Sequence, residues 1–198
     1  MNTVILEETE FGDQPVDVYT RLSSDRILFV TDIIDDLVSS DLCATLIHLD
    51  LESPEEPITI WLNSPGGDAR DVLMIYDVMQ LISSPIEVVC IGNALDEASL
   101  ILAAGTPGLR KATKNAQISV TQLNQDYMNH GSITDAKEIL KLSKDDNKKF
   151  MEIYAKCCNR KVKEVSDKFA KRVFLTPYEA KSFGMIDNIV QLNKKGVK

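Results

Sequence analysis

The sequence predicts one layered α/β domain built on a largely parallel sheet. Two observations support this fold class: short apolar, β-rich runs alternate with segments of helical periodicity, and Pro and Gly interrupt the pattern between them. With 198 residues and 44% hydrophobic side chains, the chain is long enough to bury one core and short for two. We therefore expect a single domain over residues 1–198.

The predicted elements follow one another in a regular order. Strands are expected where β-rich apolar runs occur, in residues 16–30, 57–64, 86–95, 116–122 and at the end of 175–190. Helices are expected where apolar residues recur at helical spacing, in residues 32–53, 69–84, 96–105, 133–159, 162–173 and the first part of 175–190. Gly105 is a predicted C-cap. The helix from residue 133 is unusually long, so we expect it to pack outside its own small core.

Composition and charge limit the kinds of partner that the chain is expected to bind. The chain has no apolar run of 18 residues and no basic, apolar leader at its start, so we expect neither a membrane span nor export. The four cysteines lack paired spacing for a metal, and we expect reduced thiols and no cofactor: Cys43, Cys90, Cys157 and Cys158. The net charge of −8 divides into −15 for residues 1–130 and +7 for residues 131–198. Acidic residues interleave with the C-terminal lysines, so that segment suits solvent or an acidic face of another copy better than nucleic acid.

Several segments together resemble one family. They resemble the proteolytic subunits of the Clp protease, in order and at near-family spacing. TVILEETEFGDQPVDVYTRL is similar to the axial region of that family, and LNSPGGD with IYDVMQ is similar to the substrate-binding loop and its following helix. SFGMIDNIV is similar to the closing segment. The resemblance implies a crotonase-like spiral of repeated β-β-α and βα units with a protruding handle. It places an axial loop at residues 1–18 and the handle region at about 123–158, with the handle helix at residues 134–158.

The resemblance also locates the family's Ser-His-Asp triad. Aligned from Gly92 and Ala94, the nucleophile position falls on Asp96, and the base and orienting positions fall on Thr121 and Arg172. A carboxylate attacks an amide poorly, Thr takes no proton near neutral pH, and Arg has the wrong charge to hold an imidazole. We therefore expect no catalytic residue to be intact, and we expect Asp96 to cap the following helix.

Two binding regions are implied by the same resemblance. Gly66 and Gly67 in the SPGG segment match the loop whose N–H groups form the oxyanion hole and hold extended substrate. The alternative is that this segment only turns the chain between strand and helix. Chaperone docking positions fall on Thr59, Trp61, Leu81 and Lys111. Two of these four are polar where the family usually has an aromatic residue, so we expect weak docking on homomeric rings.

The leading functional hypothesis is a non-catalytic, R-type Clp subunit. Such a subunit builds heptameric rings, stacked into a tetradecameric chamber, as a homo-oligomer or with catalytic paralogues, and modulates docking of the AAA+ chaperone ring that delivers unfolded polypeptide. The expected location is the cytoplasm, or a plastid or apicoplast stroma after removal of a transit peptide.

Two enzyme hypotheses stand beside it. In the first, Ser99 is a displaced nucleophile served by His130 as base; the other histidine, His48, is expected to be packed within its helix. In the second, the crotonase-like relationship points to acyl-CoA chemistry, with Asp96 and Glu97 as acids or bases, although no basic cluster is placed to hold CoA phosphates.

Overall fold

The computed structural model describes residues 4–9, 12–122 and 133–190. The described strands are β1 (Val4–Thr9), β2 (Gly12–Asp17), β3 (Ile27–Val30), β4 (Ile58–Ser64), β5 (Ile86–Ala94), β6 (Arg110–Thr113), β7 (Gln117–Val120), β8 (Val173–Leu175) and β9 (Asn188–Val190). The described helices are α1 (Val18–Ser24), α2 (Asp36–Glu52), α3 (Ala69–Leu81), α4 (Ala98–Ala104), α5 (Ile133–Cys157), α6 (Val162–Lys168) and α7 (Pro177–Phe183).

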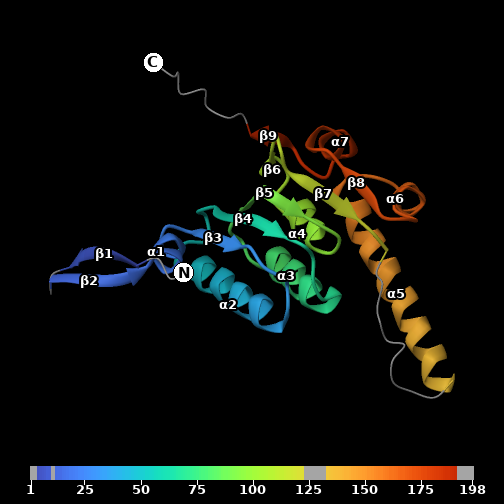
Figure 1. The fold of residues 1–198 in the computed structure, drawn as a ribbon, viewed down its shortest axis with the longest axis horizontal. Coiled ribbons are helices and arrows are strands. Elements are labelled where there is room, and N and C mark those ends of the chain that lie inside the picture. Colours follow the sequence, from blue (N-terminus) through green and yellow to red (C-terminus); the bar gives the residue numbers. More distant parts are fainter. Residues whose placement is uncertain (1–3, 10–11, 123–132, 191–198) are drawn as a thin grey trace.

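The main sheet is largely parallel, as predicted. Its strands run in the order β3-β4-β5-β6-β9, each pair parallel, and β5 also pairs with β7. Only the short β8, which lies antiparallel to β7, departs from this direction. The result is a mixed α/β domain in which the last residues of β5 pair with the first residues of β7, and this pairing positions the site described below (Figure 1).

The core forms because apolar residues alternate along β4 and surround α4. Ile58, Ile60 and Leu62 are fully buried on β4, while every residue of α4 from Ala98 to Ala104 is buried. A helix with no polar face must lie between other elements, and α4 contacts α3, α5 and β5.

Two local predictions are wrong. Residues 16–30 do not form one strand, because Asp17 accepts hydrogen bonds from the N–H groups of Tyr19 and Thr20 and so starts α1. The predicted helix over 162–173 ends at Lys168, and the three-residue β8 follows it. Gly105 is the C-cap of α4, as predicted, with a φ of −54° rather than a left-handed one. A Cβ there would lie 3.0 Å from both Arg110 and Val88 side chains, so close packing explains this glycine.

Two extensions leave the compact body in Figure 1. The first is the hairpin of β1 and β2, whose strands pair only with each other. The second is α5, which packs through its C-terminal half, where Phe150, Met151 and Tyr154 are buried, while Leu140 and Leu142 are more than half exposed. The long helix therefore extends beyond its own core, as expected; the handle residues before it, 123–132, lie outside the described part of the chain.

Candidate functional site

The site is built around a sharp connection between β5 and α4. β5 ends at Ala94 and α4 begins at Ala98, and between them Asp96 has a φ of +48°. The connection is fixed by hydrogen bonds from the Leu95 N–H to the Ser64 carbonyl (3.1 Å) and from the Ala98 N–H to the Leu95 carbonyl (3.0 Å). Left-handed backbone at a residue other than glycine is uncommon and marks a constrained position.

Asp96 is held from two sides. Its Oδ2 accepts a hydrogen bond from Arg172 Nη2 at 2.6 Å, and its Oδ1 accepts one from Ser119 Oγ at 2.9 Å. The Ser119 Oγ in turn accepts from the Asp96 backbone N–H at 3.0 Å. With only 15% of its side chain exposed, Asp96 is a fixed anion paired with a half-exposed cation.

The expectation that Asp96 caps α4 is therefore wrong. The N-cap position belongs to Glu97, which has helical backbone angles and makes no side-chain capping bond. The Asp96 carboxylate turns instead toward Ser119 and Arg172, because the left-handed backbone aims it at β7 and at the start of β8.

The three residues predicted for the triad positions lie at one end of the β7–β8 pair. In the antiparallel β7–β8 pair, Val120 lies opposite Val173, so Thr121 and Arg172 follow at the same end of the pair. Arg172 reaches Asp96 directly, whereas Thr121 is partly buried and follows Val120 at that end of the pair. The Asp96 carboxylate is engaged by the Arg172 cation, and neither Thr121 nor Arg172 can accept a proton from a nucleophile near neutral pH.

Ser99 is not placed to attack a substrate. It is fully buried, its Oγ donates to the Asp96 carbonyl at 2.8 Å, and it lies 2.7 Å from Tyr154 Oη. Burial raises the pKa of the Tyr154 hydroxyl well above its usual value, so this group is no base at neutral pH. His130, the predicted base for Ser99, lies outside the described residues.

The other histidine contradicts its prediction. His48 is exposed rather than packed, and its Nε2 lies 3.6 Å from Glu52 one helical turn away.

The glycine loop is fixed by backbone contacts. A Cβ at Gly67 would lie 2.0 Å from the Ile34 carbonyl oxygen, so no other residue fits there. Gly66 has a φ of +114°, and its carbonyl accepts from the Ile34 N–H at 2.9 Å. The Gly66 N–H donates to the buried Ser64 Oγ at 3.2 Å, so it is not presented to a ligand as the sequence led us to expect.

Glu97 faces this loop. Its Oε2 lies 3.1 Å from the point that a Cβ on Gly66 would occupy. Burial raises the pKa of the Glu97 carboxyl, and the negative charge of Asp96 adds to this, while the backbone N–H groups of Glu97 and Gly67 act in the opposite direction. Sequence reasoning considered Glu97 only as an acid or base; its contact with the loop depends on the turn geometry at Asp96.

Three of the four predicted docking residues lie on strands of the main sheet, and two of them contact Glu87, which the sequence did not reveal. Thr59 Oγ1 donates to Glu87 Oε2 at 3.1 Å, and Lys111 Nζ forms an ion pair with the same carboxylate. Trp61 stacks on Phe29, with ring centroids 6.2 Å apart. Glu87 lies opposite Thr59 in the β4–β5 register, a pairing that becomes predictable only once the register is known. The fourth docking residue, Leu81, ends α3 and is 79% exposed.

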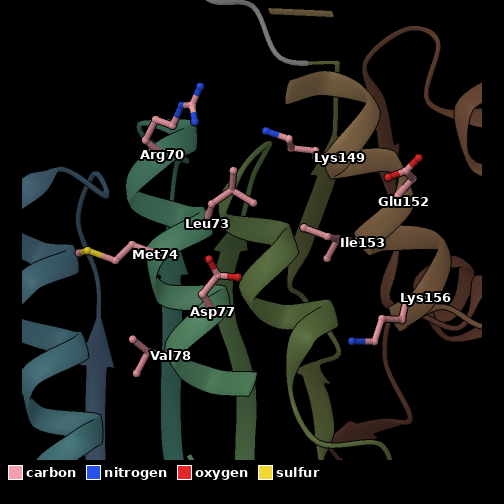
Figure 2. A pocket seen from close by; sticks show the side chains of 9 residues that line it. All are labelled: Arg70, Leu73, Met74, Asp77, Val78, Lys149, Glu152, Ile153 and Lys156. Atoms are coloured by element: carbon pink, nitrogen blue, oxygen red, sulfur yellow. The ribbon is translucent and has the colours of Figure 1, made fainter. Parts of the chain in front are cut away.

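A separate groove lies between α3 and α5. Figure 2 shows Lys149, Ile153 and Lys156 directed from α5 toward α3, across an open hollow of about 680 Å³. At one end Arg70 Nη2 donates to Oδ2 of the buried Asp146 at 2.6 Å. None of the residues predicted for the triad, the glycine loop or the docking surface lines this groove.

A strained strand-to-helix turn is also found in serine hydrolases, where it carries the nucleophile. In this chain the turn next to the glycine loop carries Asp96. The sequence model of the Clp protease family matches residues 10–193. The chain therefore belongs to the Clp protease family, a family of serine proteases whose members form oligomeric rings with Clp chaperones. Among the described residues, no group of acidic, His and Cys side chains is arranged to hold a metal ion. The described helices also include none that could cross a membrane.

Proposed function

We propose that this chain is a non-catalytic subunit of a Clp protease core, which contributes to the ring and its chamber while active paralogues cleave the substrate. The observation that carries the proposal is the Asp96–Arg172 ion pair. Two of the three triad positions satisfy each other's charge, so the site is filled by a stable contact rather than merely missing a nucleophile.

The buried Ser99 supports the same proposal. Its hydroxyl is engaged with Asp96 and Tyr154, and moving it to the surface would leave the buried Tyr154 hydroxyl with only its longer hydrogen bond to the Asp96 carbonyl, at 3.3 Å. Losing one such buried hydrogen bond costs about 0.5–1.5 kcal/mol, which opposes a displaced-nucleophile mechanism.

The catalytic half of the proposal is tested by intact-mass analysis after exposure to a fluorophosphonate probe. An active Clp proteolytic subunit, treated in parallel, should be fully modified. We expect no mass shift on this chain, because no described serine is both exposed at the site and paired with a base. Labelling at Ser99 would overturn the proposal.

The proposed assembly with active paralogues is tested by co-expression. A tagged copy of this chain, co-expressed with a catalytic Clp subunit, should be recovered in mixed rings that native mass spectrometry resolves by composition. Recovery of separate homomeric rings only, for each catalytic paralogue tested, would contradict the proposed role in mixed rings.

A further inference from the structure

The groove between α3 and α5 has an apolar floor and a cationic side. Leu73 and Val78 of α3 and Ile153 of α5 line it and are half-buried. Lys149 and Lys156 are directed from α5 into the same hollow of about 680 Å³ (Figure 2). We call Lys149, Ile153 and Lys156 the basic half-stripe. Such a groove suits a helix that carries carboxylates beside an apolar side chain.

Contacts across the groove hold α3 and α5 together near both of its ends. At one end Arg70 Nη2 donates to Oδ2 of the buried Asp146 at 2.6 Å. Near the other end Lys156 Nζ donates to Tyr76 Oη at 3.4 Å, which is long for a hydrogen bond. The groove is therefore a fixed feature of the fold, and the weakly engaged Lys156 is available to a carboxylate.

The charge of Lys149 is also poorly satisfied within the groove. Its Nζ lies 3.4 Å from Asp146, which already accepts a bond of 2.6 Å from α3. The other carboxylates in the lining are Asp77 on α3 and Glu152, which lies 3.7 Å from Lys148. Among the described residues, the basic half-stripe has no ion pair shorter than its 3.4 Å contact, whereas a good charge-assisted bond is about 2.8 Å long.

The N-terminal half of α5 carries the complementary pattern. Glu138, Leu142 and Asp145 are exposed there, and we call them the acidic half-stripe. At about 100° per residue, they and the basic half-stripe fall within about 80° of one side of the helix. One face of α5 therefore reads acid, leucine, acid along its first half and lysine, isoleucine, lysine along its second.

The two half-stripes match when two α5 helices run antiparallel. Each half-stripe spans seven residue steps, or about 10 Å, so the charged ends of one fall opposite the charged ends of the other. The matched pairs are Glu138 with Lys156, Leu142 with Ile153, and Asp145 with Lys149. Because every copy carries both half-stripes, a two-fold axis forms the whole set of contacts twice.

We propose that α5 pairs antiparallel with α5 of a second copy, so that the acidic half-stripe of each copy lies in the groove of the other. The pattern then selects the partner, because a paralogue whose α5 lacks it would leave the basic half-stripe without facing carboxylates. The proposed function requires only that this chain enters rings with paralogues. This inference goes beyond it by naming the chain that α5 contacts.

Charge reversal on the full-length protein tests the pairing. Sedimentation equilibrium over a concentration series gives the dissociation constant of self-association. The double variants Glu138→Lys/Asp145→Lys and Lys149→Glu/Lys156→Glu should each associate at least about tenfold more weakly than the wild type, because like charges then meet in both halves of the contact. An equimolar mixture of the two variants should regain the wild-type constant, since cations again face carboxylates throughout. A wild type that stays monomeric, reversal without effect, or a mixture as weak as its components would overturn the proposal.

Two exposed leucines of α5 give a matched pair of substitutions that leaves the buried core intact. Leu142 belongs to the acidic half-stripe and is 52% exposed, whereas Leu140 is 55% exposed and lies about 200° around the helix from it. Leu142→Asp should weaken association about tenfold, and Leu140→Asp should leave it unchanged. Equal effects of the two substitutions would overturn the proposal. This chain is measured alone, so failure of the inference is distinguishable from failure of the proposed function, which the co-expression experiment tests.

Discussion

At the scale of single residues, the backbone of Asp96 forms a tight turn while its side chain forms an ion pair. The backbone has the left-handed conformation of a strained turn, with φ at +48°, whereas the side chain is engaged by Arg172 and Ser119. Under the proposed non-catalytic role, restoring one functional group at this position does not restore a mechanism, because Thr121 and Arg172 stand at the predicted positions of the base and its orienting partner.

Asp96→Ser should therefore produce no peptidase activity. The serine hydroxyl would meet Thr121 and an unpaired Arg172, neither of which can accept its proton near pH 7. The measurement is hydrolysis of a fluorogenic peptide by the purified variant, with an active Clp subunit as positive control. Turnover above the background of the wild-type chain would reveal a base near Thr121.

Glu97 gives a pH-dependent prediction at the same scale. Burial raises its pKa in the folded state, so the folded protein binds more protons than the unfolded chain at pH values above the ordinary glutamate pKa of about 4.3. The ionised carboxyl consequently lowers stability at neutral pH, and this penalty disappears as the pH falls toward that value.

Glu97→Gln should raise the free energy of unfolding at pH 7 and lose this advantage as the pH approaches 4. Urea unfolding at a series of pH values measures the difference from the wild type. Glu55→Gln, at an exposed position in the turn before β4, is the matched control and should change little. An advantage that grows as the pH falls would contradict the assigned direction.

At the scale of elements, α4 and α5 are joined by buried hydroxyls. The Tyr154 Oη of α5 lies 2.7 Å from Ser99 Oγ of α4. This contact joins the C-terminal half of the long helix to the site. Residues 55 apart in the sequence make this contact, so no periodicity in either helix predicts it.

Tyr154→Phe should lower the free energy of unfolding by about 1–2 kcal/mol, because the Ser99 hydroxyl loses a buried partner. Chemical denaturation followed by circular dichroism measures the loss. Tyr178→Phe is a suitable control, since Tyr178 is 63% exposed on α7 and should show no comparable effect. Equal stability of the two variants would mean that the buried pair contributes nothing.

A second junction between elements depends on Asp187. Its carboxyl accepts from Arg110 Nη2 at 2.7 Å and Nε at 2.9 Å, and Arg110 is almost fully buried. Burial alone would raise the pKa of Asp187, but the hydrogen bonds of Arg110 and of the Gly108 N–H outweigh it and lower the pKa. A depressed pKa stabilises the folded state above the unfolded pKa of about 3.9, and this stabilisation is lost as the pH falls through the folded value.

Asp187→Asn should cost about 3 kcal/mol at pH 7, since it leaves the Arg110 guanidinium buried without its counter-charge. The cost should shrink as the pH falls below about 4, where the unfolded wild-type chain becomes protonated, and it should vanish below the depressed pKa of the folded state. Urea unfolding at both pH values tests this, with the exposed Asp167→Asn on α6 as control. A cost independent of pH would rule out the charge explanation.

At the scale of the whole molecule, the predicted docking surface is polar for a structural reason. Glu87 binds both Thr59 and Lys111, so three strands share one ion-paired cluster beside the aromatic pair of Trp61 and Phe29. An apolar anchor from a chaperone would have to desolvate this cluster, which is unfavourable.

Replacing the cluster should improve docking. The triple variant Thr59→Tyr, Glu87→Val and Lys111→Phe should bind a Clp chaperone ring at least about tenfold more tightly than the wild-type chain, because apolar contact replaces a desolvation cost. Surface plasmon resonance on assembled rings measures this. Wild-type rings that already bind as tightly as rings of an active subunit would contradict the prediction.

The sequence predicts the strands of the main sheet best where they are long and apolar. β4 and β5 are predicted nearly to the residue, but β6 and β8 have four and three residues and carry too few positions for alternation to be recognised. The substituted triad is located by family resemblance. The Asp96–Arg172 contact, the wrong prediction that Asp96 caps α4 and the contact of Glu97 with the glycine loop all depend on the backbone conformation at Asp96, which residue type does not determine.

The support of the glycine loop has a consequence for how such a chain changes over evolution. Ile34 and Ser64 fix the loop through main-chain and hydroxyl contacts, and neither residue takes part in the Asp96–Arg172 pair. Mutations that abolish catalysis can therefore accumulate without collapsing the loop, and mutations in its supports would be removed by selection for folding alone. A lineage can therefore lose catalysis and still keep the folded glycine loop.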